Sequence, residues 1–260
     1  MRDTGHILAV MAHPDDVEFL CAGALARLRR KGYQIHIATM TTGDCGSMDL
    51  SPEQISQVRI IEAQASARLL DATFQHLDEK DGLICYQPAT ICKTVEVLRG
   101  SRAFLVITHS PSDYMIDHEV TAQLVRNAAF CAGIPNFKTG AMVTAPHLEG
   151  IPYLYYAMPL EGKDSLGHQV AMDIQVDISQ EMETKTAMLK CHASQRDWLM
   201  KHHGVDEYVA QMKRWAAEAG RPLGVAYAES FRQHRGHAYP QRNILVELLG
   251  TSQANPQPGN

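Results

Sequence analysis

Residues 6–18 read HILAVMAHPDDVE, an apolar run that passes directly into a histidine and three acidic side chains. A continuous apolar run, without polar alternation, is typical of a strand that is buried on both faces. Residues 16–31 then repeat apolar side chains at helical spacing and end at Gly32, a common helix terminator. The sequence therefore predicts a buried strand over 6–11 and a helix over 16–31, joined by a short polar turn.

The same alternation of strand and helix continues through the first half of the chain. Apolar runs and helical spacing predict strands over 35–40, 73–77 and 103–108 and helices over 53–70, 88–99 and 117–131. Strands that alternate with helices form a mostly parallel sheet with helices on both faces. We expect a Rossmann-like α/β fold, in which ligands collect at the carboxyl ends of the strands.

The second half of the chain is expected to be richer in loops. Residues 133–167 contain many glycines, prolines and aromatic side chains, a composition typical of long functional loops. The remaining patterns predict strands over 153–157 and 174–178 and helices over 180–192 and 206–219. We expect residues 1–250 to form one domain whose loop-rich C-terminal portion shapes a substrate pocket, and residues 251–260 to be a disordered tail.

The composition is that of a globular protein with an ordinary core. Hydrophobic residues make up 45% of the 260 residues, and the formal net charge is -5. No long run of Lys or Arg is present, so we expect no nucleic acid partner. No apolar run is long enough to span a bilayer and no cleavable signal peptide is recognisable, so we expect a cytoplasmic protein with no membrane partner. The six cysteines are expected to be reduced.

Side chains that can bind a cation follow two of the predicted strands. His13, Asp15 and Asp16 follow the first strand, and residues 109–119, HSPSDYMIDHE, follow the strand that ends just before them. Neighbouring parallel strands would bring both clusters to one edge of the sheet, where His13, Asp16 and His118 form a set of two imidazoles and one carboxylate. Such a set binds catalytic zinc and non-haem iron. A simpler role for one aspartate is to cap the following helix.

At these residues the sequence resembles the PIG-L/LmbE-like deacetylases, metal-dependent enzymes that remove N-acetyl groups from N-acetylglucosamine conjugates. Residues 12–18 match the family's AHPDDxE signature completely, and residues 115–118 match a second, HPDH-like signature in part. Weaker similarities lie at residues 59–62, 192–195 and 228–232. Two signatures in the expected order on the expected elements make coincidence improbable.

The resemblance implies a role for each residue of the two signatures. His13, Asp16 and His118 would bind the metal, which is Zn²⁺ or, because the ligand set suits it as well, Fe²⁺. Asp15 would be the general base that draws a proton from the attacking water. Asp117 would be a catalytic-site residue that orients a histidine ligand, although capping its own helix is an alternative. Many relatives assemble into trimers or hexamers, so we expect a homo-oligomer.

One position departs from the family pattern. Many members carry a histidine three residues before the ligand histidine, thought to stabilise the oxyanion or donate a proton, and this chain has Met115 there. A thioether can do neither. The expected substitutes are His109, which we place among the catalytic residues, or Tyr114. Three later histidines could also substitute if the second half folds over the site: His192, His234 and His237.

Contacts to substrate are expected from Arg59, Tyr114 and His192. Arg59 could bind a hydroxyl or phosphate group, or it could pair with Glu62 on the same helix face. The tyrosines of residues 153–156 could stack on a sugar ring, but packing inside a buried strand is the simpler expectation.

These residues predict a metal-dependent hydrolase that removes an N-acetyl group from an N-acetylglucosamine-type conjugate, a small-molecule partner. One alternative keeps the metal and changes the substrate to a non-sugar amide or ester. Another is a non-catalytic carbohydrate-binding protein, which Met115 would explain. A nucleophilic Cys45 has no identifiable base, and the first strand–helix turn lacks the GxGxxG pattern of dinucleotide binding.

Overall fold

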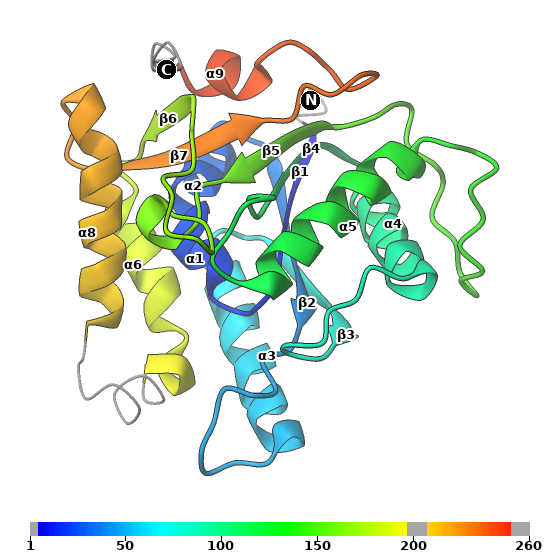
Figure 1. Ribbon diagram of the computed structural model, residues 1–260, viewed down its shortest axis with the longest axis horizontal. Helices are drawn as coiled ribbons and strands as arrows, with labels where there is room; N and C mark the ends of the chain where they lie inside the picture. The colour runs from blue at the N-terminus through cyan, green and yellow to red at the C-terminus, as the bar shows by residue number, and fades with distance from the viewer. Residues whose placement is uncertain (1–4, 197–206, 251–260) are drawn as a thin grey trace.

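The computed structural model describes residues 5–196 and 207–250. Within these residues the strands form one seven-stranded sheet in the order β3-β2-β1-β4-β5-β7-β6 (Figure 1). Their bounds are β1 His6–Met11, β2 Gln34–Thr41, β3 Thr73–Glu79, β4 Ala103–Thr108, β5 Tyr153–Ala157, β6 Ile174–Asp177 and β7 Ala228–Gln233. The strands from β3 to β5 run parallel, and β7 is antiparallel to both of its neighbours. The predicted Rossmann-like α/β fold with a mostly parallel sheet is confirmed.

Strand β1 lies inside the sheet and is buried on both faces. Ile7 and Ala9 belong to one hydrophobic core, and Leu8 and Val10 belong to the other. Successive side chains of a strand point to opposite faces, so a strand between two cores must be apolar at every position. This is why its sequence is a continuous apolar run.

Helices cover both faces of the sheet, as predicted (Figure 1). One face carries α4 Pro88–Ser101 and α5 Ile116–Ala132. The other face carries α1 Asp16–Leu20, α2 Ala22–Arg30, α3 Pro52–Arg68, α6 Met182–Lys190, α8 Tyr208–Gly220 and α9 Ile244–Leu249. Two short 3₁₀ turns, η1 Leu160–Gly162 and η2 Arg221–Leu223, complete the described elements. Long segments without strand or helix flank β5, in keeping with the expected loop-rich second half.

The prediction of one continuous helix over 16–31 is wrong. The helix is interrupted at Cys21, whose backbone (φ -147°, ψ 2°) is not helical and separates α1 from α2. The carboxylate of Glu229 accepts hydrogen bonds from the backbone N–H groups of Gly23 (2.8 Å) and Ala24 (2.7 Å), in the first turn of α2. A carboxylate at a helix N-terminus satisfies donors that have no partner within the helix. The interruption therefore creates a second helix start, which a side chain from β7 occupies.

Two elements of the second half were absent from the sequence-based predictions. They are β7, which reads AESFRQ, and α9. The burial of Glu229 on β7 depends on Lys185, whose Nζ lies 2.5 Å from its carboxylate, and such a distant partner leaves no local pattern. The helix predicted over 206–219 is observed as α8, while residue 206 and the predicted tail over 251–260 lie outside the described residues.

Two other sequence expectations concern the membrane and the thiols. In the described ranges 5–196 and 207–250, no helix is long and apolar enough to cross a bilayer. All six cysteines lie in these ranges as free thiols.

Replacing Lys185 by methionine should lower the free energy of unfolding by about 3–5 kcal/mol, because it leaves Glu229 buried without its countercharge. Lys185 is fully buried on α6, and its ammonium group also donates to the carbonyl of Phe19 (2.8 Å). Urea denaturation measures the change. Lys190→Met, at an exposed position of the same helix, is the matched control and should stay close to wild type. Equal free energies of unfolding for the two variants would contradict the stabilising role of the Lys185–Glu229 ion pair.

Candidate metal centre

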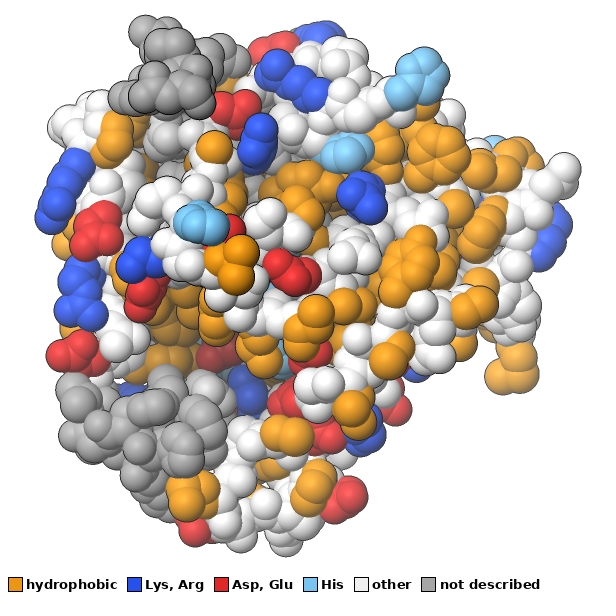
Figure 2. All heavy atoms as spheres, viewed as in Figure 1, with side chains coloured by type: hydrophobic (Ala, Val, Ile, Leu, Met, Phe, Trp, Pro, Cys, Tyr) orange, Lys and Arg blue, Asp and Glu red, His pale blue; other side chains and the backbone are white. Residues whose placement is uncertain are grey.

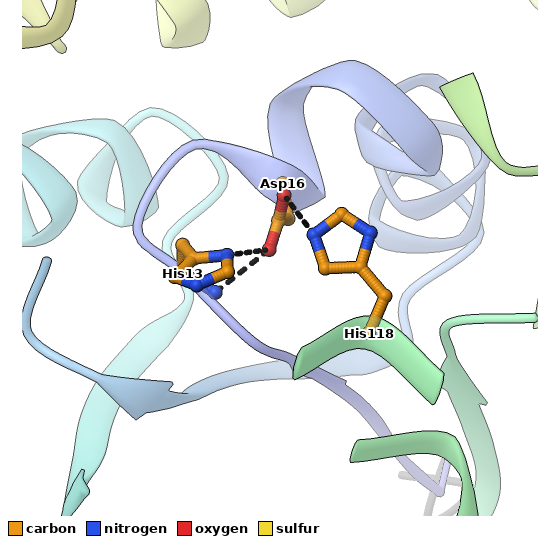
Figure 3. Close-up of side chains that lie close together, drawn as sticks. All are labelled: His13, Asp16 and His118. Carbon is orange, nitrogen blue, oxygen red and sulfur yellow. Dashed lines mark hydrogen bonds and ion pairs between the residues drawn. The ribbon is translucent and has the colours of Figure 1, made fainter. Parts of the chain in front are cut away.

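The carboxyl edge of the sheet brings the two polar clusters of the sequence together. Since β1 and β4 are adjacent and parallel, the loop after β1 and the start of α5 lie side by side. His13, Asp16 and His118 point toward one another there (Figure 3). The Asp16 carboxylate lies 3.4 Å from His13 Nδ1 and 3.5 Å from His118 Nε2, and potential ligand atoms of the three residues lie within 4.8 Å of one another.

Two further carboxylates fix the orientation of the imidazoles. Asp117 Oδ2 lies 3.2 Å from His13 Nε2 and accepts a backbone hydrogen bond from Gly82 at 2.7 Å. Asp113 Oδ1 lies 2.9 Å from His118 Nδ1. A carboxylate accepts the ring N–H, which leaves the opposite nitrogen of each ring, the one nearer Asp16, available to bind a cation. Carboxylates that hold histidine ligands in this way are typical of metal sites.

The spacing and charge of the cluster fit a divalent cation. In a tetrahedral zinc site with bonds of 2.0–2.1 Å, neighbouring ligand atoms are about 3.3 Å apart. Here Asp16 Oδ2 lies 3.4 Å from His13 Nδ1 and Asp16 Oδ1 lies 3.5 Å from His118 Nε2, and one ligand atom from each residue lies within 4.8 Å of the others. Burial lowers the pKa of His13, but its hydrogen bonds to Asp117 and Asp16 and the nearby charges raise it to about 10. The surroundings thus favour positive charge at this point, and a cation supplies that charge in place of the ring proton.

Asp15 lies beside this cluster in a conformation that is rare for a residue with a side chain, with φ of 100°. Tyr208 from α8 donates a hydrogen bond of 2.5 Å to Asp15 Oδ2, and the guanidinium of Arg59 lies 3.4 Å from Oδ1. Asp15 is the N-cap of α1 and Asp16 is its first residue. Asp15 contacts Tyr208 and Arg59 while Asp16 contacts the imidazoles, so each carboxylate has its own environment.

The two adjacent aspartates have opposite electrostatic environments. Burial raises the pKa of Asp15, and the nearby guanidinium of Arg59 only partly opposes this effect. Burial also acts to raise the pKa of Asp16, but the charges of His118 and His109 together with hydrogen bonds from the imidazoles hold it well below its usual range. Neighbouring carboxyl groups whose pKa values are pushed apart are suited to different roles, one as an anion and one as a proton acceptor.

His109 is brought to the cluster but lies beneath it. Its ring stacks on that of His118 with centroids 3.8 Å apart, and it is fully buried. Its Nε2 accepts the backbone N–H of Ala12 at 2.9 Å and lies 3.2 Å from the Asp16 carboxylate. These contacts place it behind the ligand ring, and its predicted catalytic role stays a prediction.

The three residues predicted to touch substrate have different surroundings. Tyr114 is about half exposed (48%) and contacts His118 edge-on, with ring centroids 5.3 Å apart. Arg59 is buried and donates to the carbonyl of Pro14 (2.6 Å), in addition to its contact with Asp15. His192 is buried at 3.3 Å from Glu18, and although burial lowers its pKa, that carboxylate raises it overall.

The remaining candidates make no side-chain hydrogen bond or ion pair with His13, Asp16 or His118 among the described residues, although the carbonyl of Met115 accepts a hydrogen bond from the backbone N–H of His118 at 3.1 Å. Met115 is half-buried at the N-cap of α5. His234 lies 3.1 Å from the hydroxyl of Tyr156, and His237 is exposed. Tyr155 is fully buried, so packing inside the strand is the interpretation that the structure favours for these tyrosines. Glu62, the alternative partner of Arg59, instead accepts hydrogen bonds from Ser194.

Sequence reasoning did not assign three residues of the site. Asp113 lies in the polar stretch 109–119, and its position five residues before a ligand histidine could have indicated a role in orienting that histidine. Tyr208 comes from a helix nearly two hundred residues beyond Asp15 and had no local signal. Asp81 lies 4.0 Å from His13, and with Asp44 and Cys45 it forms a second group of potential ligands that is separate from His118, whereas a further group, His109 and Asp113, shares His118 with the first.

The fold and the cluster define a class of protein: a Rossmann-like α/β protein with two imidazoles and a carboxylate at the carboxyl edge of its sheet. The family model for PIG-L, described as GlcNAc-PI de-N-acetylase, matches residues 8–129. The chain is 33% identical over 136 residues to the uncharacterized deacetylase YaiS of Escherichia coli, covering 50% of this chain and 69% of that protein. The chain belongs to the PIG-L family, as its signatures indicated.

Two other comparisons describe the range of similar proteins. The chain is 24% identical over 231 residues to the 4-oxalmesaconate hydratase of Pseudomonas putida, covering 86% of this chain and 84% of that protein. The crystal structure of N,N'-diacetylchitobiose deacetylase from Pyrococcus horikoshii superposes with a TM-score of 0.73 at 23% identity, over 92% of this chain and 88% of that chain. The fold is therefore shared by relatives with different activities.

Proposed function

We propose that this protein is a metal-dependent hydrolase that removes an N-acetyl group from an N-acetylglucosamine-type conjugate. The observation that carries the proposal is the position of Asp15 beside a cation-binding set made of His13, Asp16 and His118. The family description, a de-N-acetylase of an N-acetylglucosamine conjugate, supports the bond and the substrate class. The two-imidazole set suits zinc, which is the ion we propose, and iron is the alternative.

The chain's own residues divide the reaction between them. A cation bound by the three ligands would supply Lewis-acid polarisation of the amide carbonyl. Asp15 accepts a proton from the attacking water, and its raised pKa makes the carboxylate a stronger base. The same carboxyl group then delivers the proton to the departing amine nitrogen as the C–N bond breaks. Tyr208 and Arg59 hold Asp15 in place through this exchange.

An acetate-release assay tests the proposal. The protein is stripped of metal, reloaded with zinc or iron in separate samples, and given a panel of N-acetylglucosamine conjugates. We expect acetate and the free amine to appear in equal amounts only in a metal-loaded sample. Metal binding with no turnover of any acetylated amine would reject the proposal and favour the carbohydrate-binding alternative.

A second candidate function is the addition of water to an unsaturated carboxylic acid. The similarity to the 4-oxalmesaconate hydratase, which extends over 86% of this chain, favours it. The same Asp15 would move a proton to or from water, and Met115 would be no defect because no amine has to leave. Loss of ultraviolet absorbance by an unsaturated dicarboxylate, without acetate release from any amide, would select this reaction.

Met115→His should raise the deacetylation rate at least about tenfold if the family histidine serves as a proton donor in this fold, since a positioned acid typically contributes more than that. The position is suitable because Met115 is the N-cap of α5, three residues from His118. The rate is measured with the best substrate of the panel. An unchanged rate would remove this position from the proton path.

Assembly and location are further proposals. We propose a homo-oligomer, for which the exposed apolar side chains over α5 and the segment after it are suitable (Figure 2). They include Ile116, Phe130, Met142 and Val143. Light scattering coupled to gel filtration gives the number of chains. A cytoplasmic location remains our prediction, and on the face in Figure 2 basic side chains form no continuous stripe that would suit nucleic acid.

A further inference from the structure

A cavity of about 380 Å³ is lined in part by Ser110 and Ser112, which lie between His109 and Asp113 in the chain, and it has no role in the proposed reaction. Its walls come from the segment after β4, from β5 and from the end of β7. The polar side chains that line it include Ser110, Ser112, Tyr156, Arg232, His234 and Arg235.

Strand geometry directs Arg232 to this cavity. On β7, Phe231 packs into one hydrophobic core, so its neighbour Arg232 projects from the opposite face. Arg232 pairs in register with Tyr156, whose side chain belongs to that opposite face. A second guanidinium follows three residues later, on Arg235.

The cavity carries an excess of positive charge that the protein does not neutralise. The side chain of Arg232 makes no hydrogen bond or ion pair with any residue in the described ranges, and that of Arg235 donates to the neutral side chain of Gln233 (3.3 Å). The acidic side chain at the cavity is Asp173, which forms no ion pair with either arginine in the part of the chain that the structure describes. Two arginines and one carboxylate thus line the cavity.

The segment after β4 contributes to both the metal centre and the cavity. Ser110 and Ser112 line the cavity. The residues on either side of them contact His118: the ring of His109 stacks on it with centroids 3.8 Å apart, and Asp113 Oδ1 lies 2.9 Å from its Nδ1. One wall of the cavity is therefore built by the segment that positions a ligand histidine.

We propose that this cavity is a substrate subsite that binds an anionic group, a carboxylate or a phosphate, carried by the molecule that reacts at the metal centre. The inference rests on the proposed function in one respect, because it assumes that the reaction occurs at His13, Asp16 and His118. Arg232 is the main contact, since a guanidinium matches both oxyanions with two parallel N–H donors. The hydroxyl groups of Ser110 and Ser112 supply further donors.

Binding to the metal-loaded full-length protein tests the inference. The probes are N-acetylglucosamine, its 1-phosphate and N-acetylmuramic acid, which differ in carrying no anion, a phosphate or a carboxylate. Titration calorimetry should show that Arg232→Gln weakens binding of one or both anionic probes about tenfold or more, as the loss of a charged hydrogen-bond pair implies. The dissociation constant of the neutral sugar should stay unchanged. The stronger of the two anionic responses identifies the chemistry of the group.

Arg68→Gln is the matched control, because Arg68 is an exposed arginine on α3 outside the cavity. It should leave all three dissociation constants unchanged. Equal binding of all probes by wild type and Arg232→Gln, or equal losses in both variants, would overturn the inference. Inorganic phosphate and succinate serve as probes independent of the reaction. If these anions bind in an Arg232-dependent way but no acetate is released from any conjugate, the subsite is retained and the deacetylase function is rejected. If acetate is released but the binding of no anion depends on Arg232, the deacetylase function is retained and the subsite is rejected.

Discussion

Asp15→Asn should reduce kcat for acetate release by roughly 10²–10⁴-fold, the usual contribution of a positioned general base. Asparagine cannot accept the proton, yet it tolerates the left-handed backbone region that Asp15 occupies at φ 100°. It also retains one acceptor oxygen for Arg59. The ligands of the cluster are unaltered, so metal content should stay near that of wild type.

Tyr208→Phe separates the loss of the base from the loss of its support. Tyr208 donates a hydrogen bond of 2.5 Å to the Asp15 carboxylate, and phenylalanine at this position removes the hydrogen bond but leaves the Asp15 base in place. We expect a reduction in kcat much smaller than that of Asp15→Asn. The hydrogen bond from Tyr208 lowers the pKa of Asp15, so its loss raises that pKa and shifts the rise of kcat with pH to higher pH. Near wild-type kcat in Asp15→Asn would remove Asp15 from the mechanism, whatever the behaviour of Tyr208→Phe.

The parallel half of the fold could be predicted because its signal is local. Strand β1 is apolar at every position, since it lies between two cores. The residues that follow it are polar because they stand at the carboxyl edge of the sheet. The meeting of His13 with His118 followed from the adjacency of two parallel strands and needed no knowledge of side-chain packing.

The remainder depends on contacts between distant parts of the chain. At the break between α1 and α2, the start of α2 is bonded to the carboxylate of Glu229, which is 205 residues beyond Ala24. Glu229 can be buried there because Lys185 pairs with it. In the same way, Arg59 lies in a stretch with a weak similarity to the family, but only the fold shows that its guanidinium contacts Asp15 and the Pro14 carbonyl. Burial that depends on long-range ion pairs leaves no periodic pattern to read.

His118→Ala should abolish stable metal binding, weakening it by more than the roughly 10–100-fold that follows loss of a residue that only orients a ligand. The imidazole would no longer face Asp16 from α5, and only His13 and Asp16 would remain of the set. Metal analysis after dialysis measures the content. Zinc should raise the melting temperature of the wild type and leave that of the variant unchanged, because a ligand stabilises only a fold that binds it.

Asp113→Asn provides the graded comparison. Asp113 contacts His118 Nδ1 at 2.9 Å. In the proposed set it orients this histidine and does not bind the cation itself. Its variant should therefore retain metal with an affinity lowered about 10–100-fold, between wild type and His118→Ala. The order of the three zinc affinities is decisive. If His118→Ala bound zinc as tightly as Asp113→Asn, residue 118 would be only a packing residue of α5. The cation would then be sought at the second group of potential ligands, Asp44, Cys45 and Asp81.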